Sequence, residues 1–408
     1  MNGVWHKKRL GSLALKITDG SHNPPKGGPE SEYLMLSSKN VFDDDLHYAE
    51  PRYLTAEQFG QEDRRTGIVP GDVLLTIVGT VGRSAVVPTN APRITLQRSV
   101  AVIRPQQQLV ESRFLMYSFI EQNAELNERA RGVAQKGIYL ETLKEFEIVL
   151  PPLPEQRQIV GILDEAFEGI ATAKANAEKN LQNARAVFES HLQSVFTQRG
   201  DGWVEKRLGD LSRINYGYTE SASAEKVGPH FLRITDIQDN RVDWASVPYC
   251  PIDKTDYPKY KLVDGDIVFA RTGATTGKSY LVIDPPQAVF ASYLIRLQLS
   301  DKELLPKFVN LFFRTHSFWE TIRSGVSGSA QGGFNATKLG EIVIPFPKST
   351  NEQQAIVAKL DTLTEETQHL ESIYRRKVDA LEALKKSLLH QAFSGDLTAS
   401  ERLQERVA

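Results

Sequence analysis

The sequence contains the segment Glu155-Gln156-x-x-Ile159-Val160-x-x-Leu163-Asp164, and the same pattern returns as Glu352-Gln353-x-x-Ile356-Val357-x-x-Leu360-Asp361. The two copies are separated by about half of the 408 residues, whereas solenoid repeats recur every 20–50 residues or so. A second pair of matching segments runs from Trp5 to Leu13 and from Trp203 to Leu211. The chain is therefore a tandem duplication, and a duplicated fold with a pseudo-twofold axis suits a target that also has two halves.

A proline-rich segment stands before each copy of the glutamate–glutamine pattern and stops a strand there. After it, the spacing of apolar residues changes to steps of three and four, without any proline, which predicts one helix of ~40 residues and about 60 Å in each half. Because a lone helix of that length cannot bury its apolar stripe, we predict that the two pair as an antiparallel coiled coil. The alternative is two separate helices, each packed on its own domain. The predicted stripes are Ile159, Leu163, Ala166, Ile170, Ala173, Ala177, Leu181, Ala184, Phe188, Leu192 and Val195, and Ile356, Leu360, Leu363, Thr367, Leu370, Tyr374, Val378, Leu381, Leu384 and Leu388.

The remainder of each half predicts strands with short helices between them. The strands are predicted at 73–78, 99–104 and 148–150, then at 267–270, 293–297 and 342–344, with helices near 114–131 and 308–322. The fold class is thus α+β: two mixed α/β domains separated by two long helices, with pseudo-twofold symmetry. We expect boundaries at 1–152 for the first domain, 153–199 for the first long helix, 200–348 for the second domain, 349–396 for the second long helix and 397–408 for a tail.

Composition restricts the class of protein. The chain is 40% hydrophobic and has a single cysteine, Cys250, so it has no disulfide framework. No signal-peptide pattern and no apolar run of about 20 residues is visible, and we expect a cytoplasmic protein. The formal net charge of −2 does not by itself predict a nucleic-acid binder, but local patches matter more than the sum.

The duplicated segments together resemble the DNA-specificity subunit of type I restriction–modification systems. The shared features are the Trp-x-x-Lys-Arg-Leu-Gly-x-Leu start, a Gly-Asp-[Ile/Val]-[Leu/Val] strand that leads into a glycine-rich turn, and the glutamate–glutamine helix start. The resemblance covers nearly the whole chain. It implies a subunit without catalysis or cofactor, in which two target recognition domains each recognise one half of a bipartite double-stranded DNA site. It also implies that the helices separate these domains and dock two modification (methyltransferase) subunits, which restriction subunits join.

A glycine-rich loop occurs in both halves and is a candidate DNA contact. Glycines, hydroxyls and a cation suit a DNA backbone or groove, because amides, hydroxyls and basic side chains all bind phosphates. The second loop is not a P-loop, since only three residues separate Gly273 from Gly277 and the motif needs four. The alternative is an ordinary tight turn between strands. The candidate residues are Thr80, Arg83 and Ser84, and Arg271, Thr272, Thr275, Thr276 and Lys278.

Two further pairs of loops carry residues able to contact bases or phosphates. Asn23-Pro24-Pro25 resembles an amino-methyltransferase signature, but Lys26 stands where that signature has an aromatic residue. The alternatives are solvated loops and helix caps. The candidates are His22, Asn23 and Lys26 with Tyr216 and Tyr218 in one pair of loops, and Gln135 and Lys136 with Ser329, Gln331 and Asn335 in the other.

The histidines and the cysteine have no metal-ligand spacing, so the sequence predicts no metal site. We therefore predict a sequence-specific DNA-binding subunit with no catalysis of its own. The runner-up is a coiled-coil scaffold whose paired domains bind protein.

Overall fold

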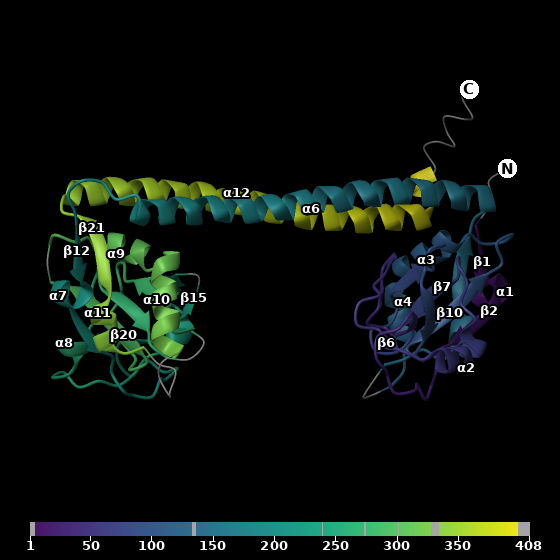
Figure 1. Ribbon diagram of the computed structural model, residues 1–408, viewed down its shortest axis with the longest axis horizontal. Helices are drawn as coiled ribbons and strands as arrows, with labels where there is room; N and C mark the ends of the chain where they lie inside the picture. The colour runs from purple at the N-terminus through teal and green to yellow at the C-terminus, as the bar shows by residue number, and fades with distance from the viewer. Residues whose placement is uncertain are drawn as a thin grey trace, which may run out of the picture. The chain divides into compact units, whose positions relative to one another are not determined.

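The computed structural model describes residues 5–132, 136–238, 240–272, 275–300, 302–327 and 334–398. The chain divides into two compact units, one formed by Met1–Ala177 with Arg376–Ala408 and the other by Glu178–Arg375. Each unit thus takes one globular part and about half of each long helix. The units combine segments that are distant in sequence, because each globular part packs on segments of both helices (Figure 1).

The first half begins with the shorter elements and ends with a long helix. Its helices are α1 (Leu10–Leu13), α2 (Ala56–Thr66), α3 (Ser112–Glu121), α4 (Asn123–Arg129), α5 (Leu140–Lys144) and α6 (Leu153–Thr197). Its strands are β1 (His6–Arg9), β2 (Ala14–Asp19), β3 (Tyr33–Leu36), β4 (Val41–Phe42), β5 (Asp45–Leu46), β6 (Arg52–Tyr53), β7 (Val73–Thr76), β8 (Ser84–Val86), β9 (Arg93–Leu96), β10 (Val100–Pro105) and β11 (Glu147–Leu150).

The second half has the same plan. Its helices are α7 (Leu208–Leu211), α8 (Tyr257–Tyr260), α9 (Pro306–Phe312), α10 (His316–Ser327), α11 (Ala336–Glu341) and α12 (Thr350–Ser394), with a 3-10 turn η1 (Ile234–Asp236). Its strands are β12 (Trp203–Arg207), β13 (Ser212–Tyr216), β14 (His230–Leu232), β15 (Ile237–Gln238), β16 (Arg241–Val242), β17 (Ile267–Ala270), β18 (Ser279–Leu281), β19 (Ala288–Phe290), β20 (Leu294–Leu299) and β21 (Val343–Pro347).

The two sheets confirm the duplication strand by strand. The first domain has a four-stranded antiparallel sheet in the order β2-β10-β7-β8, and the second has β13-β20-β17-β18. The strand that follows each tryptophan pairs with the strand before the long helix, as β1 with β11 and β12 with β21. The single helix predicted after the last strand of each sheet, β10 or β20, is instead a pair of helices, α3 with α4 and α9 with α10.

The duplicated Gly-Asp pair fixes the start of β7 and β17. The carboxylate of Asp72 accepts from the Val69 amide at 3.0 Å, and that of Asp266 accepts from the Val263 amide at 3.0 Å. Both aspartates are about 1% exposed, and burial raises the pKa of Asp266. Asp72 also accepts two bonds of 2.8 Å from Arg104, so the repeated aspartate closes a turn and ties two strands together.

The duplicated glutamine attaches each long helix to its domain. Gln353 is fully buried; its Oε1 accepts from the Leu305 amide at 2.9 Å, and its Nε2 donates to the Glu303 and Pro347 carbonyl oxygens at 2.7 and 2.8 Å. Gln156, also fully buried, makes the same three bonds to the Glu111 amide and to the Leu109 and Pro151 carbonyl oxygens, at 2.9, 3.0 and 2.9 Å. Because a buried amide must satisfy all its bonds, this side chain locks the angle at which the helix leaves the domain.

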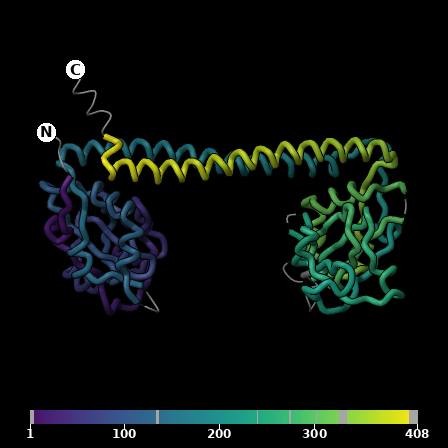
Figure 2. The backbone as a smooth tube through the Cα atoms, turned by 180° about the vertical axis from the view of Figure 1, so that it is seen from behind, coloured from purple at the N-terminus to yellow at the C-terminus, as the bar shows by residue number. Residues whose placement is uncertain are grey.

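The long helices α6 and α12 lie side by side within each unit, as Figures 1 and 2 both show. In the first unit Lys174 pairs with Glu382 at 2.7 Å, and in the second Arg185 pairs with Glu371 at 3.2 Å. The second pair lies further along α6 than the first, and it lies earlier along α12 by the same number of residues. The antiparallel pairing predicted from the apolar stripes is therefore confirmed. Most predicted α6 positions are buried, although Phe196 replaces Val195 at the end of the stripe.

Two predicted stripe positions are wrong. Leu370 and Leu384 are 42% and 46% exposed. Small or polar residues are buried in the middle part of the two long helices, such as Ala177 of α6 and Thr367 of α12. The buried apolar stripe of α12 is therefore narrower there than at its two ends.

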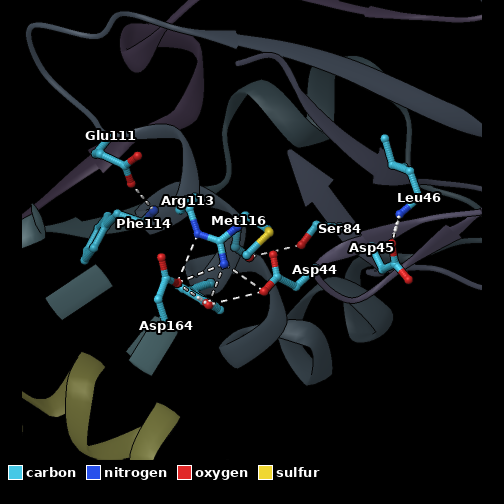
Figure 3. Close-up of polar contacts among 10 residues, drawn as sticks. Asp44, Asp45, Leu46, Ser84, Glu111, Arg113, Phe114, Met116 and Asp164 are labelled. Carbon is cyan, nitrogen blue, oxygen red and sulfur yellow. Dashed lines mark hydrogen bonds and ion pairs between the residues drawn. The ribbon is translucent and has the colours of Figure 1, made fainter. Parts of the chain in front are cut away.

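An ion-pair network also connects α6 to the first domain. Asp164 of α6 accepts from Arg113 of α3 at 2.8 Å and from the Tyr117 hydroxyl at 2.6 Å, and Arg113 reaches Asp44 at 2.8 Å (Figure 3). Burial and the neighbouring carboxylates raise the pKa of Tyr117, so it stays a donor. Asp164 of the repeated pattern therefore attaches α6 to the first domain. Its counterpart Asp361 lies 3.4 Å from Lys307 of α9.

Candidate nucleic-acid interface

The candidate loops begin where β2 and β13 end, at two glycines that lie against a neighbouring strand. A Cβ on Gly20 would meet the Leu96 carbonyl oxygen at 2.1 Å, and one on Gly217 would meet the Ala291 carbonyl oxygen at 2.2 Å. Only glycine permits this approach. The following residues, Ser21 and Tyr218, then donate their amides to Leu96 and Phe290, both at 2.8 Å. The two halves therefore direct their loops out of the sheet from the same point.

In the first domain several predicted contacts are exposed. His22, Asn23, Lys26, Thr80 and Lys136 all reach solvent. His22 is held in place, because its Nε2 lies 2.8 Å from the Asp19 carboxylate. Arg83 is half-buried, with its guanidinium 5.0 Å from the centre of the Phe42 ring, so part of it packs instead of facing outward.

The prediction for Ser84 is wrong. This residue is fully buried in β8, and its hydroxyl donates to the Met116 carbonyl oxygen at 3.0 Å (Figure 3). The loop ends one residue earlier than the glycine and hydroxyl pattern indicated, so Ser84 attaches the sheet to α3 and cannot reach DNA.

In the second domain, Tyr216 and Arg271 form one structure. The Arg271 guanidinium lies 4.9 Å from the centre of the Tyr216 ring, and its Nε donates to the Ser292 carbonyl oxygen at 3.1 Å. The Tyr216 hydroxyl accepts from the Ala336 amide at 3.1 Å, and the ring is 43% exposed. An arginine that is held in this way by a ring and a carbonyl oxygen is preorganised as a hydrogen-bond donor.

The other predicted residues of this domain have mixed environments. Lys278 is exposed, while Thr272 and Thr275 are half-buried and bond each other through the Thr275 hydroxyl and the Thr272 carbonyl oxygen at 3.3 Å. Three other candidates are buried or bonded within the domain. Thr276 is only 9% exposed, Tyr218 packs on Tyr260 with ring centres 5.1 Å apart, and Asn335 caps α11 by accepting from the Lys338 amide at 2.8 Å. Gln135, Ser329 and Gln331 lie outside the described residues.

A cleft of about 500 Å³ in the first domain brings together residues that the sequence interpretation missed. Asp19, almost buried at the end of β2, binds Arg65 of α2 through both its carbonyl oxygen, at 3.0 Å, and its carboxylate. Arg98 and Arg131 also line the cleft. Among the described residues, neither of these two side chains has a carboxylate partner. The lining includes Asp19, His22, Arg65, Arg98, Arg131 and Tyr139, whose ring is 71% exposed.

The second domain has a smaller cleft of different chemistry next to the corresponding strands. It has a volume of about 340 Å³, and Glu220, Arg233, Ser292 and Tyr293 are among its lining residues. Its arginine, Arg233, pairs with Asp236 at 2.7 Å. The first cleft is therefore cationic, while the second is mixed in charge.

Among the residues described, no group of His, Cys, Asp and Glu has the arrangement of a metal site. The same part of the chain contains no helix that combines the length and the apolar character required to cross a membrane.

A model of the type I restriction modification DNA specificity domain matches residues 37–182 and again 200–376. The chain is 24% identical to the type I restriction enzyme EcoKI specificity subunit of Escherichia coli K12, over 74% of this chain and 69% of that protein. It is also 24% identical to the putative MjaX specificity subunit of Methanocaldococcus jannaschii, over 96% and 93% of the two chains.

Solved structures are similar in fold. A chain from a study of assembly and conformational transition of the type I R-M system gives a TM-score of 0.77 at 20% identity, covering 97% of this chain and 99% of that one. The HsdS subunit of Thermoanaerobacter tengcongensis gives 0.57 at 19% identity, covering 97% and 98%. With a family match in each half that together spans most of the sequence, the chain belongs to the family of type I restriction–modification DNA specificity subunits.

Proposed function

We propose that the protein is a DNA-binding subunit without catalysis that recognises a bipartite, asymmetric site. The observation that supports this most directly is one fold present twice with chemically different clefts, cationic in the first domain and mixed in the second. Identical clefts would fit a palindrome, whereas unlike clefts fit two different half-sites. The family match favours this interpretation over a coiled-coil scaffold whose domains bind protein.

The partners follow from the family and from the surfaces of the long helices. Val187 of α6 and Leu370, Ile373 and Leu384 of α12 are apolar and 38–57% exposed. We propose that such positions dock two methyltransferase subunits, one on each repeat, and that restriction subunits join this assembly. DNA is then modified or cut in the cytoplasm by these partners.

Footprinting on duplexes chosen by selection tests the bipartite site. We expect two protected segments with unprotected or sequence-independent base pairs between them, and an affinity that falls linearly with salt on logarithmic axes, because basic side chains displace counterions from phosphates. The full chain is assayed both alone and with its modification subunit. A single contiguous protected core would contradict the proposal.

A domain exchange tests whether the two half-sites are recognised independently. Replacing residues 1–150 by the first domain of another family member should change one half-site and leave the other as it was, since each domain has its own candidate loops and cleft. Sequencing of methylated sites in cells that express the hybrid gives the result. Changes in both half-sites would show that the domains do not act separately.

A further inference from the structure

We propose that Arg65 reads a guanine in the half-site of the first domain, while Arg98 and Arg131 bind the flanking phosphates. This inference rests on the proposed DNA-binding function and assigns chemical roles within it. It starts from the cationic cleft, where the described lining residues include these three arginines and one carboxylate, that of Asp19.

Arg65 is fixed before any ligand arrives. Its Nε donates to the Asp19 carbonyl oxygen at 3.0 Å, and one terminal nitrogen, Nη2, bonds the Asp19 carboxylate and lies 3.4 Å from Nε2 of His22. Among the described residues the other terminal nitrogen, Nη1, has no partner. Because a carboxylate only accepts, Nε2 of His22 carries the hydrogen of its 2.8 Å bond to Asp19 and does not accept from Nη2. One N–H of Nη2 serves Asp19, so the other N–H of Nη2 and those of Nη1 remain as a fork at the end of the guanidinium, and such a fork matches the O6 and N7 acceptors of guanine.

The helix that carries Arg65 is equally well fixed. Arg65 lies in the last turn of α2, where Nζ of Lys16 donates to the Thr66 carbonyl oxygen at 2.5 Å and Arg104 donates to the Gly67 carbonyl oxygen at 2.6 Å. At the other end, Thr55 forms a capping box with Gln58. A side chain on a helix secured at both ends is positioned accurately enough to discriminate between base edges.

Charge separates the two roles. The carboxylate of Asp19 offsets the charge of Arg65 but leaves its outer donors in place, which weakens attraction to phosphate and preserves hydrogen bonding to a base. Arg98 and Arg131 have no such partner among the described residues, so their full charge is available. Both side chains are exposed, and the backbone of both residues is hydrogen-bonded. The Arg98 amide donates to the Ser21 carbonyl oxygen at 2.9 Å, and the amides of Arg131 and Gly137 each donate to the other's carbonyl oxygen at 2.9 Å.

The experiment measures affinity and specificity separately. The site of the full chain, co-purified with its modification subunit, is first obtained by selection from random duplexes. Each position of the first half-site is then changed, and dissociation constants are measured at several salt concentrations. For the wild type, replacing one guanine should lower affinity about 10–100-fold, the range of a bidentate base contact. Arg65→Ala should bind the original and the changed duplex with similar affinity.

Matched variants complete the design. Arg64→Ala removes the same charge from the adjacent exposed position of α2, which does not line the cleft, and should keep the preference for guanine. Arg98→Ala and Arg131→Ala should weaken binding to all sequences alike and reduce the salt slope by about one each. Arg65→Lys, which keeps the charge but loses the planar fork, should lose most of the preference. The thermal unfolding transition of the first unit, measured for each variant and for the wild type, checks that the first domain is folded.

Three results would overturn the assignment while leaving the proposed function intact. These are a wild type that binds specifically without preferring guanine in the first half-site, an Arg65→Ala variant that keeps the preference, and an Arg65→Ala variant that weakens all sequences equally with a smaller salt slope. A wild type that selects no sequence at all would contradict the proposed function itself.

Discussion

Replacing Gln353 by alanine is expected to lower the melting temperature of the second unit by about 6–12 °C. The substitution leaves a buried amide at Leu305 and two buried carbonyl oxygens, at Glu303 and Pro347, without their bonds of 2.7–2.9 Å. Each orphaned buried group costs about 1–3 kcal/mol, and water that enters the vacated space recovers part of this. A net loss of about 3 kcal/mol, at roughly 2–4 °C per kcal/mol for a unit of this size, gives the expected shift.

Calorimetry on three variants separates hydrogen bonding from volume. Gln354→Ala alters the exposed neighbour on the same turn of α12 and should leave the transition within about 1 °C, since surface changes away from special features cost little. Gln353→Glu keeps the shape but replaces a donor by an acceptor that faces two carbonyl oxygens, so it should be at least as damaging as alanine. If Gln353→Glu melted like the wild type, the three bonds would not be what holds the helix to the domain.

The residues that repeat between the halves proved to be scaffold. Gln156 and Gln353 lock the long helices, Asp72 and Asp266 close the turns before the sheet strands, and Asp164 and Asp361 pair with basic side chains of the domain. Such roles depend on local geometry that both copies share. The repeats therefore predicted the architecture and its order of elements well, but they did not mark the cleft that is proposed to recognise DNA.

The proposed recognition surface could be predicted only in part. Arg65 and Asp19 are separated in sequence by a loop, four short strands and most of α2, and no spacing rule brings them together. Arg98 and Arg131 likewise belong to different loops that meet only in the fold. Arg271 was named as a candidate because it stands in a glycine-rich turn, whereas Arg65 stands in an ordinary helix. The residues that determine DNA specificity are expected at positions where the two halves differ. A comparison of repeats does not identify such positions.

Local patterns also named residues to which the neighbouring backbone gives a structural role. The glycine and hydroxyl pattern placed Ser84 in a contact loop, but the strand begins there and buries it. Asn335 has a side chain suited to adenine, yet it stands before α11, where an asparagine is a preferred cap. A residue type defines what a side chain can do, and the neighbouring backbone decides which of those possibilities is used.

Lengthening both long helices by one heptad is expected to increase the preferred spacer of the DNA site by about three base pairs. Helices α6 and α12 each continue without interruption from one unit into the other. Repeating Ala177–Asn183 in α6 and Ile373–Asp379 in α12 adds about 10 Å to each, equal to about three base pairs at roughly 3.4 Å each. The two repeated segments lie opposite each other in the helix pair. The first lies between Lys174 and Arg185, and the second lies between their ion-pair partners, Glu382 and Glu371.

The insertion keeps the apolar seam in register, since seven residues correspond to two turns of a 3.5-residue repeat. Neither half-site should change, because no residue of either domain is altered. The added base pairs rotate one half-site relative to the other by about 100°, so the affinity is expected to fall even for the best spacer. Selection from duplexes with randomised spacer length is therefore more informative than affinity for one site.

Insertion into α6 alone, which leaves α12 too short to pair along it, is the control and should lower the melting temperature without defining a new spacer. If the double insertion left the preferred spacing unchanged, the long helices would not set the length of the spacer. Their remaining role would be that of a docking surface for the partner subunits.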